Sequence, residues 1–509
     1  MGPERRTGRS LRWLLRGTVE LPPGVDAVIA GLSLDSRRVG PGELFLACRG
    51  RRTAGHRYID QAVARGAAAV AYEVAAGEEG RLQGPLGGPP LVAVPELSRR
   101  AGPLAARFHG EPARALRLVG VTGTNGKTSC AWFLAQALDA AGHRCGVVGT
   151  LGSGLPRRLR PGTHTTPDPV SLQAALAGLR AAGATAAALE VSSHALDQGR
   201  VEGLPFVGAV FTNLSRDHLD YHGDVEAYGA AKARLFAAPG LRWAVINADD
   251  PFGRRLLGAL PTGVQAVPYG LGRQVGEGLR GRLLASGPEG IRLAVEGPWG
   301  RGELRSPLLG AFNAANLLAA LGVLLLEGVP LEPALARLAR LRPAPGRMEA
   351  HGGGRLPLAV VDYAHTPDAL AQALGALRPL AAGRLWCVFG CGGERDRGKR
   401  PLMGEAAARL ADRLVLTDDN PRGEDPARIV AEIRAGIPSG ASVTVIHDRW
   451  AAIAHALRRA APGDVVLVAG KGHEREQEVA GARRPFSDRH VVEALLRERA
   501  LQGGAEEEG

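Results

Sequence analysis

The sequence predicts an α/β fold in three domains, with a parallel sheet and crossover helices in the central domain. Three observations favour this fold. Between residues 117 and 343, apolar runs of strand length alternate with helical stretches, as they do in a parallel sheet. One of these runs leads through a glycine-rich turn into a helix-like stretch. A second series of strands, each followed by a polar loop, begins after a proline-rich linker at residues 342–347.

The bulk composition is that of a globular protein with room for several cores. A chain of 509 residues accommodates two to four domains. The net charge of +12 is compatible with nucleic acid, with anionic small substrates or with an arginine-rich proteome. Aromatic residues are only 4%, and no dense basic run contains them, so nucleic acid is not an expected partner. Five cysteines without a CxxC pair indicate a cytoplasmic protein with free thiols, and no apolar run approaches the length of a membrane span.

Residues 1–116 form the first predicted domain. The runs Leu44–Ala47 and Ala68–Tyr72 are expected to be strands, and Tyr58–Arg65 is expected to be a helix. The same domain contains the segment 34–38, which includes Leu34 and Ser36 and places a serine and arginines beside a carboxylate. Such a segment either contacts a phosphate or forms a capped turn with a solvated arginine, and both interpretations stay open.

A phosphate-binding loop is predicted after the strand Leu116–Val121, in the second domain, residues 117–343. Its residues are Gly123, Thr124, Asn125, Gly126, Lys127, Thr128 and Ser129. The glycines let the backbone approach a phosphate, while the following helix start and Lys127 attract negative charge. The hydroxyl of Thr128 or Ser129 is a ligand for magnesium. The strict phosphate-loop pattern has glycine where Val121 stands, so an ordinary strand-to-helix turn is the alternative.

Carboxylates and histidines gather at two later strand ends of this domain. Glu190 follows the apolar run Ala186–Leu189, and the carboxyl ends of parallel strands face the ligand crevice, so Glu190 is a candidate metal ligand. The strand Val207–Phe211 leads into a loop in which His218 lies among aspartates, a density that packing does not explain. Lys232, on the helical stretch 226–236, taken alone is interpreted as a surface lysine.

Two asparagines mark the start of a long apolar helix that ends near residue 326. Asn313 and Asn316 are three residues apart and therefore share one helix face. They either recognise a base or cap the helix, and the pattern does not separate these roles.

Residues 344–509 form the third predicted domain. Its expected strands are Leu358–Val361, Leu385–Phe389, Arg413–Leu416 and Val465–Val468. Each is followed by a polar loop, and in a doubly wound sheet such loops line one crevice. The glycine-rich loops at 390–398 and 470–472 are alternatively tight turns.

Taken together, these segments resemble the Mur ligases, ATP-dependent amide-forming enzymes of peptidoglycan synthesis. The resemblance covers nearly the whole chain and rests on six segments in a fixed order: 123–128, 190–194, 213–222, 346–349, 362–368 and 419–422. Within the family it is closest to the branch that adds the third residue to UDP-N-acetylmuramoyl-L-alanyl-D-glutamate. It implies an N-terminal UDP-sugar domain, a central ATP-binding domain and a C-terminal Rossmann-like domain for the amino acid.

The resemblance also assigns roles position by position. It implies that the phosphate loop, Asn316, Arg347 and Asp362 contact ATP, and that Lys127, Glu190, His218 and Lys232 are catalytic. Magnesium would be held by Ser129, Glu190, His218 and Lys232, the lysine acting as a carbamate if it is carbamylated. The UDP substrate would be bound by Leu34, Ser36, Thr165, Thr166, Ser192, Gln198 and Arg200, and the amino acid by Arg395, Asp419, Asn420, Pro421, Arg422, Gly470 and Glu474.

The run Asp419-Asn420-Pro421-Arg422 resembles the signature of relatives that select meso-diaminopimelate. This amino acid carries a second carboxylate at its distal centre, which an arginine holds with two parallel hydrogen bonds. Lysine has no such carboxylate and would leave Arg422 unpaired. The resemblance therefore implies ATP and Mg²⁺ as cofactors, meso-diaminopimelate as the amine substrate and a monomeric enzyme.

Three other functions remain as alternatives. A lysine-adding ligase of the same family is the nearest. A folylpolyglutamate synthetase shares an ATP loop of this kind, but its amino-terminal part is not expected to resemble residues 30–116. A nucleotide-dependent nucleic-acid binder would use the positive charge, but it leaves the Asp/His/Glu cluster unexplained.

Overall fold

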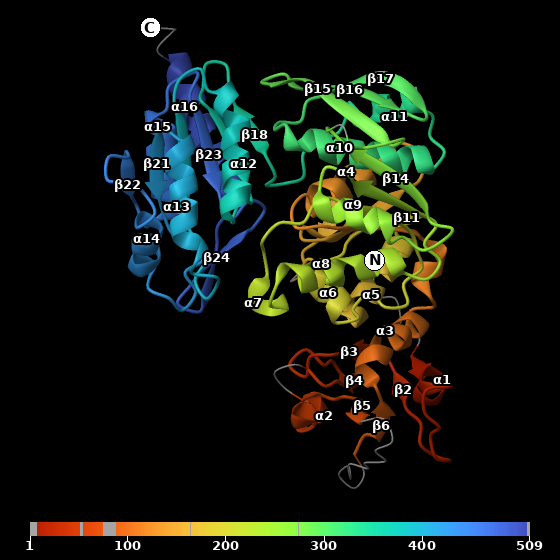
Figure 1. Ribbon diagram of the computed structural model, residues 1–509. Helices are drawn as coiled ribbons and strands as arrows, with labels where there is room; N and C mark the ends of the chain where they lie inside the picture. Colours follow the sequence, from red (N-terminus) through yellow and green to blue (C-terminus); the bar gives the residue numbers. More distant parts are fainter. Residues whose placement is uncertain (1–7, 51–53, 75–87, 163, 273, 506–509) are drawn as a thin grey trace.

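The computed structural model describes residues 8–50, 54–74, 88–162, 164–272 and 274–505. Figure 1 shows the first part of the chain below the central part, and the last part beside it. The expected α/β fold in three parts is confirmed. The domain boundaries at 116/117 and 343/344 stay predictions. None of the helices that the structure describes is long and apolar enough to cross a membrane.

The N-terminal part is built on a parallel sheet of four described strands in the order β3-β4-β5-β6. The strands are β3 (Gly31–Ser33), β4 (Glu43–Ala47), β5 (Ala69–Val74) and β6 (Leu91–Pro95), and a two-residue pair, β1 (Arg9–Ser10) with β2 (Val28–Ile29), lies beside them. The helices are α1 (Leu11–Leu15), α2 (Ile59–Ala64) and α3 (Leu97–Phe108). Both predicted strands are confirmed. The predicted helix begins as the 3-10 turn Gly55–Tyr58 and continues as α2.

The central sheet joins eleven described strands in the order β10-β9-β8-β11-β7-β12-β13-β14-β15-β16-β17. They are β7 (Arg117–Thr122), β8 (Cys145–Gly149), β9 (Gly152–Leu155), β10 (Arg158–Arg160), β11 (Ala186–Glu190), β12 (Phe206–Phe211), β13 (Trp243–Asn247), β14 (Gln265–Gly270), β15 (Leu279–Gly287), β16 (Gly290–Gly297) and β17 (Gly300–Ser306). In the middle of this order, the strands β8-β11-β7-β12-β13-β14-β15 pair in parallel, as predicted. At both edges of this sheet, short turns connect antiparallel strands that extend the expected parallel sheet.

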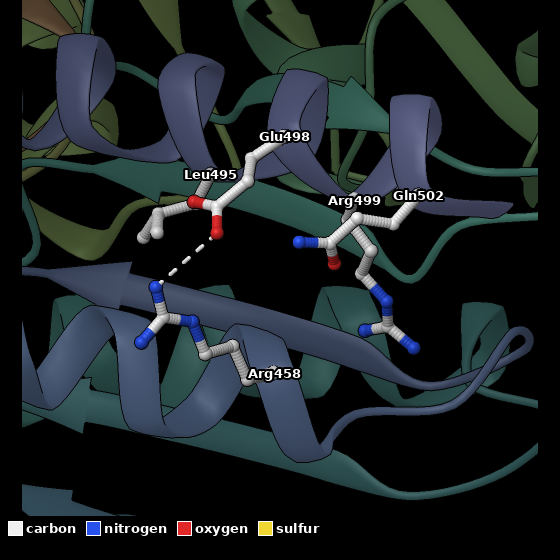
Figure 2. A pocket seen from close by; sticks show the side chains of 5 residues that line it. All are labelled: Arg458, Leu495, Glu498, Arg499 and Gln502. Atoms are coloured by element: carbon white, nitrogen blue, oxygen red, sulfur yellow. Dashed lines mark hydrogen bonds and ion pairs between the residues drawn. The ribbon is translucent and has the colours of Figure 1, made fainter. Parts of the chain in front are cut away.

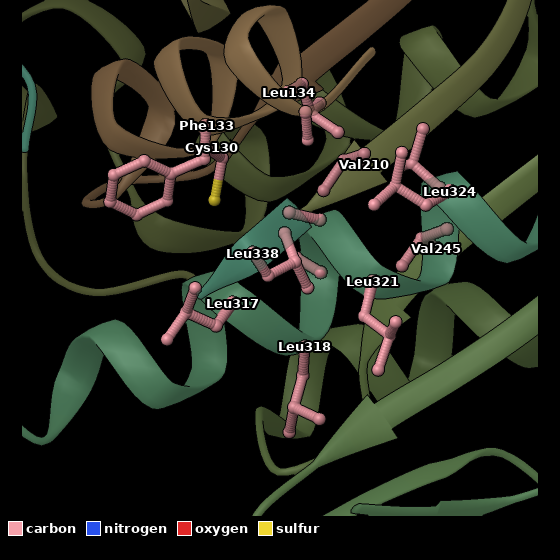
Figure 3. Packing of buried hydrophobic residues seen from close by; sticks show 14 of the residues in the cluster. Cys130, Phe133, Leu134, Val210, Val245, Leu317, Leu318, Leu321, Leu324 and Leu338 are labelled. Carbon is pink, nitrogen blue, oxygen red and sulfur yellow. The ribbon is translucent and has the colours of Figure 1, made fainter. Parts of the chain in front are cut away.

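Helices cover the central sheet and bury its apolar strands. They are α4 (Lys127–Asp139), α5 (Pro169–Ala181), α6 (Ser193–Asp197), α7 (Leu219–His222), α8 (Val225–Ala233), α9 (Pro251–Gly258), α10 (Phe312–Leu326) and α11 (Leu331–Leu338). Helix α10 is buried on nearly every side, which explains why its sequence is apolar all round. Figure 3 shows Leu317, Leu321 and Leu324 of α10 packed among Phe133 and Leu134 of α4 and Val245 of β13. This core fixes the start of α4, where the phosphate loop lies.

The C-terminal part has a six-stranded sheet in the order β18-β19-β23-β20-β21-β22. Its strands are β18 (Glu349–Gly352), β19 (Leu358–Asp362), β20 (Leu385–Phe389), β21 (Arg413–Leu416), β22 (Val443–Val445) and β23 (Val465–Ala469), with a separate hairpin of β24 (Glu476–Val479) and β25 (Ala482–Pro485). Helices α12 (Pro367–Leu377), α13 (Lys399–Leu410) and α14 (Pro426–Arg434) pack on one face, and α15 (Arg449–Arg459) and α16 (Asp488–Ala505) on the other. All four predicted strands are confirmed, so their polar loops lie at one edge of the sheet.

Candidate functional site

The phosphate loop lies between β7 and α4, as the sequence predicts. Gly126 takes a φ of +84°, and a Cβ there would lie 2.8 Å from Oδ1 of Asn316, so glycine is needed both for the turn and for the close approach. The loop is tied to the end of β12, because the backbone N–H of Thr124 donates to the carbonyl of Asn213 (2.8 Å) and that of Asn125 to its side chain (2.9 Å). Asn316, on α10, donates to Asn313 and accepts from the thiol of Cys130.

Two lysines converge on one carbonyl of this loop. Lys127 Nζ donates to the carbonyl oxygens of Gly123 (2.9 Å) and Thr124 (2.8 Å), and Lys232 Nζ donates to the same Gly123 oxygen at 2.7 Å. Lys232 is fully buried, with its ammonium 4.2 Å from the centre of the Tyr228 ring, so the interpretation of a surface lysine is wrong. Burial and the neighbouring charge of Lys127 place the pKa of Lys232 well below its ordinary value.

Glu190 ends β11 as predicted and is buried against two hydroxyl groups. Its Oε2 accepts from Thr128 Oγ1 (2.8 Å) and Thr150 Oγ1 (3.0 Å), and its Oε1 accepts from the Thr150 N–H (2.8 Å). Of the two hydroxyls that follow Lys127, the one beside Glu190 belongs to Thr128, while the metal role of Ser129 stays a prediction. The described residues contain no group of three Asp, Glu, His or Cys side chains able to hold a metal. One carboxylate with hydroxyl oxygens still fits Mg²⁺, which commonly takes one or two carboxylates and completes its shell with phosphates and water.

His218 lies at the start of α7 in a left-handed conformation, with φ of +54°. Its Nε2 is 3.3 Å from Asp217, and its ring packs edge-on against His194 with 4.8 Å between centroids. Burial lowers the pKa of His218, Asp217 opposes that shift, and the charges of Lys127 and Lys232 reinforce it. Burial likewise lowers the pKa of Lys127, which Glu190 opposes. The predicted catalytic residues therefore lie within electrostatic range of one another.

Five of the residues predicted to bind the UDP substrate form one hydrogen-bonded network. Thr166 Oγ1 donates to the Glu190 carbonyl (2.8 Å) and lies 3.2 Å from Ser192 Oγ, and Thr165 Oγ1 lies 3.1 Å from Thr150 Oγ1. Arg200 donates to the Thr166 carbonyl (2.8 Å) and to Gln198. Leu34 and Ser36 lie apart, in the turn that follows β3 of the N-terminal part, where Ser36 Oγ donates to Gln61 (2.7 Å). No described hydrogen bond joins them to the network.

The C-terminal part contacts the phosphate loop through the linker and one helix. Arg347 Nη2 donates to Thr128 Oγ1 (3.2 Å), and its guanidinium lies 4.4 Å from the centre of the Tyr363 ring. Asn125 Nδ2 donates to Asp368 at 3.4 Å. Asp362 accepts from the N–H groups of Met348 (2.7 Å) and Ala364 (2.8 Å), so its half-buried carboxylate ties the end of β19 to the backbone next to Arg347.

The residues predicted to bind the amino acid line the adjoining strand ends. Arg422 Nη1 donates to the Gly393 carbonyl (2.7 Å), and Asn420 Nδ2 donates to Glu474 (2.8 Å). The N–H of Gly470 donates to the carbonyl of Asp362 (3.1 Å), which brings this wall beside the linker. Burial and the charge of Glu474 raise the pKa of Tyr363 to about 12, and Asp419 and Arg395 also act on that phenol. Pro421 packs against the backbone of Gly393.

Several residues of this region are absent from the sequence-based prediction. Thr150, Tyr228, Tyr363, Asp368 and Lys471 contact predicted residues but carry no spacing signal of their own. Tyr363 and Asp368 lie inside the segment 362–368 and Lys471 inside the loop 470–472, so these three could have been found. Four of the seven non-glycine residues with positive φ in the described chain, His218, Met348, Glu394 and Arg422, also lie here. Strained backbone of this kind is concentrated at functional sites.

A separate hollow of about 440 Å³ lies between the later turns of α15 and α16. Figure 2 shows Arg458 paired with Glu498 at its mouth and Arg499, Leu495 and Gln502 on α16. Arg499 donates to carbonyls at the end of α15, including that of Ala460 (2.6 Å). The two arginines of this hollow are thus paired within the helices, and the hollow lies at the end of the sheet away from the strand-end loops. It is not the candidate site.

Comparison with protein-family models places three Mur ligase domains along the chain. The Mur ligase family catalytic domain matches residues 28–102, the Mur ligase middle domain 121–324, and the Mur ligase glutamate ligase domain 346–472. The fold and the phosphate-loop site therefore define an ATP-dependent, amide-forming ligase.

Individual relatives extend this comparison over nearly the whole chain. The UDP-N-acetylmuramoyl-L-alanyl-D-glutamate--2,6-diaminopimelate ligase of Alkalilimnicola ehrlichii is 55% identical over 490 residues, 95% of this chain and 98% of the relative. That of Pseudomonas aeruginosa is 56% identical over 471 residues, 92% of this chain and 96% of the relative. The chain belongs to the Mur ligase family, as the sequence resemblance predicted.

Solved structures agree with this assignment. The structure of a UDP-N-acetylmuramoyl-L-alanyl-D-glutamate--2,6-diaminopimelate ligase matches with a TM-score of 0.68 at 38% identity, covering 97% of this chain and 99% of the other. MurF ligase from Thermotoga maritima, solved in complex with ADP, matches with a TM-score of 0.62, covering 92% of this chain and 98% of the other. At 21% identity the second likeness shows a shared fold alone.

Proposed function

We propose that this enzyme uses ATP to join meso-diaminopimelate to UDP-N-acetylmuramoyl-L-alanyl-D-glutamate in peptidoglycan precursor synthesis. The observation that carries the proposal is the contact of a two-lysine phosphate loop, through Arg347 and Asp368, with the C-terminal part. That part also carries the wall with Arg422 and Glu474. Relatives about 55% identical over more than nine-tenths of the chain bear the name of this activity.

The reaction has two steps in this account. The side-chain carboxylate of D-glutamate attacks the terminal phosphoryl group of ATP, giving an acyl phosphate and ADP. The deprotonated amine of diaminopimelate then attacks the acyl carbon, and phosphate leaves with the C–O bond electrons. Because two anions meet in the first step, neutralising and positioning them is the main task, and Lys127 supplies positive charge at the transferred phosphoryl group.

Glu190 and Thr128 would hold Mg²⁺ beside the phosphates, with His218 as a further candidate. When bound, the ion adds positive charge to the phosphate oxygens. Lys232 is suited to carbamylation, because burial favours its neutral amine, the form that reacts with CO₂. The resulting carbamate would add a negative group next to the phosphate loop. The network of Thr165, Thr166, Ser192, Gln198 and Arg200 supports binding of the UDP substrate next to Glu190.

Arg422 accounts for selection of the amine substrate. Its guanidinium donates once to the Gly393 carbonyl and lies 3.7 Å from Glu478, a long ion pair that a ligand carboxylate would outcompete. A distal carboxylate satisfies the remaining donors, whereas lysine leaves them unpaired.

A substrate panel tests the proposal. The enzyme is incubated with ATP, Mg²⁺ and UDP-N-acetylmuramoyl-L-alanyl-D-glutamate, and ADP release is followed after addition of meso-diaminopimelate, lysine or no amine. We expect turnover with diaminopimelate and at least about 10-fold lower kcat/KM with lysine, the effect of one lost charged hydrogen bond. Preference for lysine would overturn the proposed specificity. No ADP release with either amine would overturn the proposed reaction.

A further inference from the structure

Lysine is a rare residue in this chain, and its positions are informative. Of the 63 lysines and arginines, only four are lysine: Lys127, Lys232, Lys399 and Lys471. The first two share the carbonyl of Gly123, and Lys399 donates to the carbonyl of His365 (2.8 Å). In a chain whose cations are almost all arginine, we expect a lysine where a site needs a compact ammonium instead of a planar guanidinium. Lys471, the fourth, lies in the loop after β23, and none of its described hydrogen bonds reaches the phosphate loop.

The side chain of Lys471 is completely buried, and all three of its N–H donors are used. Its Nζ donates to Asn420 Oδ1 (2.9 Å), to Glu474 Oε2 (2.7 Å) and to the carbonyl of Glu476 (2.8 Å). These acceptors come from two different strand-end loops and from the hairpin strand β24. Because no part of Lys471 reaches solvent, it does not contact a substrate itself.

The bonds of Lys471 determine which groups its neighbours present. Asn420 Oδ1 accepts from both Lys471 and the N–H of Glu478 (3.0 Å), so the amide is held with its NH₂ toward Glu474, to which it donates at 2.8 Å. Glu474 Oε2 therefore receives two donors. No described residue donates to its Oε1, and the side chain is 29% exposed. One carboxylate oxygen is thus fixed in place, and the other remains available to a ligand ammonium.

The same frame continues to the arginine of this wall. The N–H of Gly393 donates to the carbonyl of Asn420 (2.9 Å), and the Gly393 carbonyl accepts from Arg422 Nη1 (2.7 Å). A shift of Asn420 therefore displaces both the acceptor at Glu474 and the anchor of Arg422.

We propose that Lys471 is a positioning residue for the amine substrate: through Asn420 it fixes Glu474 as the acceptor of the substrate ammonium and Arg422 as the donor to its distal carboxylate. This inference rests on the proposed function and deepens it. The three acceptors of Lys471 surround a single nitrogen atom. An ammonium can donate to all three from that atom, whereas a planar guanidinium cannot. A partly buried ion pair contributes little net stability, so orientation is the better account of its retention.

Steady-state kinetics of Lys471→Met, with each substrate varied in turn, test the proposal. We expect the KM for diaminopimelate to rise about 10- to 100-fold, the range for one lost charged hydrogen bond, while the KM for ATP changes less than about twofold. Lys471→Arg should not restore it. Arg458→Met is the matched control, because it also replaces a cation in this domain but lies at the hollow of Figure 2; its constants should equal those of the wild type.

A double variant separates positioning from a general loss of structure. If Lys471 acts through Glu474 and Arg422, Lys471→Met raises the KM for diaminopimelate by a smaller factor in the Glu474→Gln background than in the wild type, because the Glu474 part of its effect is already lost. Additive losses, or a normal KM in Lys471→Met, overturn the inference. Should Lys471→Met not fold, Lys471→Gln decides by the same two criteria. A wild-type enzyme that does not use diaminopimelate defeats the proposed function instead, before any variant is compared.

Discussion

At the scale of single residues, the chemistry of the site depends on how burial changes charge. Lys232 and Lys127 donate to one carbonyl oxygen, and two ammonium groups so close together repel each other. Lys232 relieves this repulsion when it loses its proton, and burial shifts its pKa in the same direction. A neutral amine beside a phosphate-binding loop is a nucleophile for CO₂, and the carbamate that forms is an anion.

Carbon dioxide should therefore regulate the enzyme through Lys232. Enzyme kept free of CO₂ is expected to have at least about 10-fold lower turnover, a typical effect of one lost metal-ligand or charged contact, and bicarbonate should restore it. Because burial lowers the pKa of Lys232, the share of neutral amine at any given pH is larger than for an exposed lysine, and the response should extend to lower pH. Ligation assays in degassed buffer with and without bicarbonate measure it. Lys232→Met is the control, since it should be inactive and unresponsive; equal activity in both buffers would count against carbamylation.

At the scale of elements, the linker at residues 342–347 turns sharply and brings the loop after β23 close to the phosphate loop. Gly346 has a φ of +67°, and a Cβ there would collide with the backbone of Gly472 and His473. Its N–H donates to Glu349 (2.7 Å). This turn delivers the next residue, Arg347, to Thr128, so one glycine couples the amine-binding loop to the phosphate loop.

Gly346→Ala is expected to impair ligation more than it impairs folding. The left-handed backbone alone costs an alanine on the order of 1–2 kcal/mol, and the backbone collision adds a displacement of Arg347. Turnover should fall about 10-fold or more, measured as ADP release at saturating substrates. Gly328→Ala is a matched control, because Gly328 has a φ of +82° with no atom within 4 Å of a Cβ. Equal losses in both variants would mean that strain alone explains the effect.

At the scale of the whole molecule, the sequence predicted the residues that have local requirements, and it missed those that reach the site only through tertiary packing. The phosphate loop and Glu190 were identifiable because glycine, lysine and a strand-end carboxylate have local requirements. The resemblance supplied the roles of Arg422 and Glu474. Thr150 was not identifiable, because a threonine with ordinary neighbours reaches Glu190 only through the packing of distant elements. The antiparallel pairing of the strands at 279–306 was not identifiable for a similar reason, because the direction in which strands pair is set by tertiary contacts.

The arrangement of the parts also defines what the enzyme must do as a unit. Arg347 and Asp368 bring the C-terminal part to the phosphate loop, while the wall that holds Glu474 and Arg422 belongs to the same part. Under the proposed function, the amine and ATP would therefore bind at different loop sets of one site. Losses at the two loop sets should consequently affect different kinetic constants.

The most direct test of the claim that the two loop sets bind different substrates is a paired kinetic comparison of Lys127→Ala and Arg422→Ala. Lys127→Ala should reduce kcat at least about 100-fold, as does loss of a group that stabilises transition-state charge. Arg422→Ala should raise the KM for diaminopimelate about 10- to 100-fold while the KM for ATP stays within about twofold. Normal turnover in Lys127→Ala, or an equal rise of both KM values in Arg422→Ala, would contradict it.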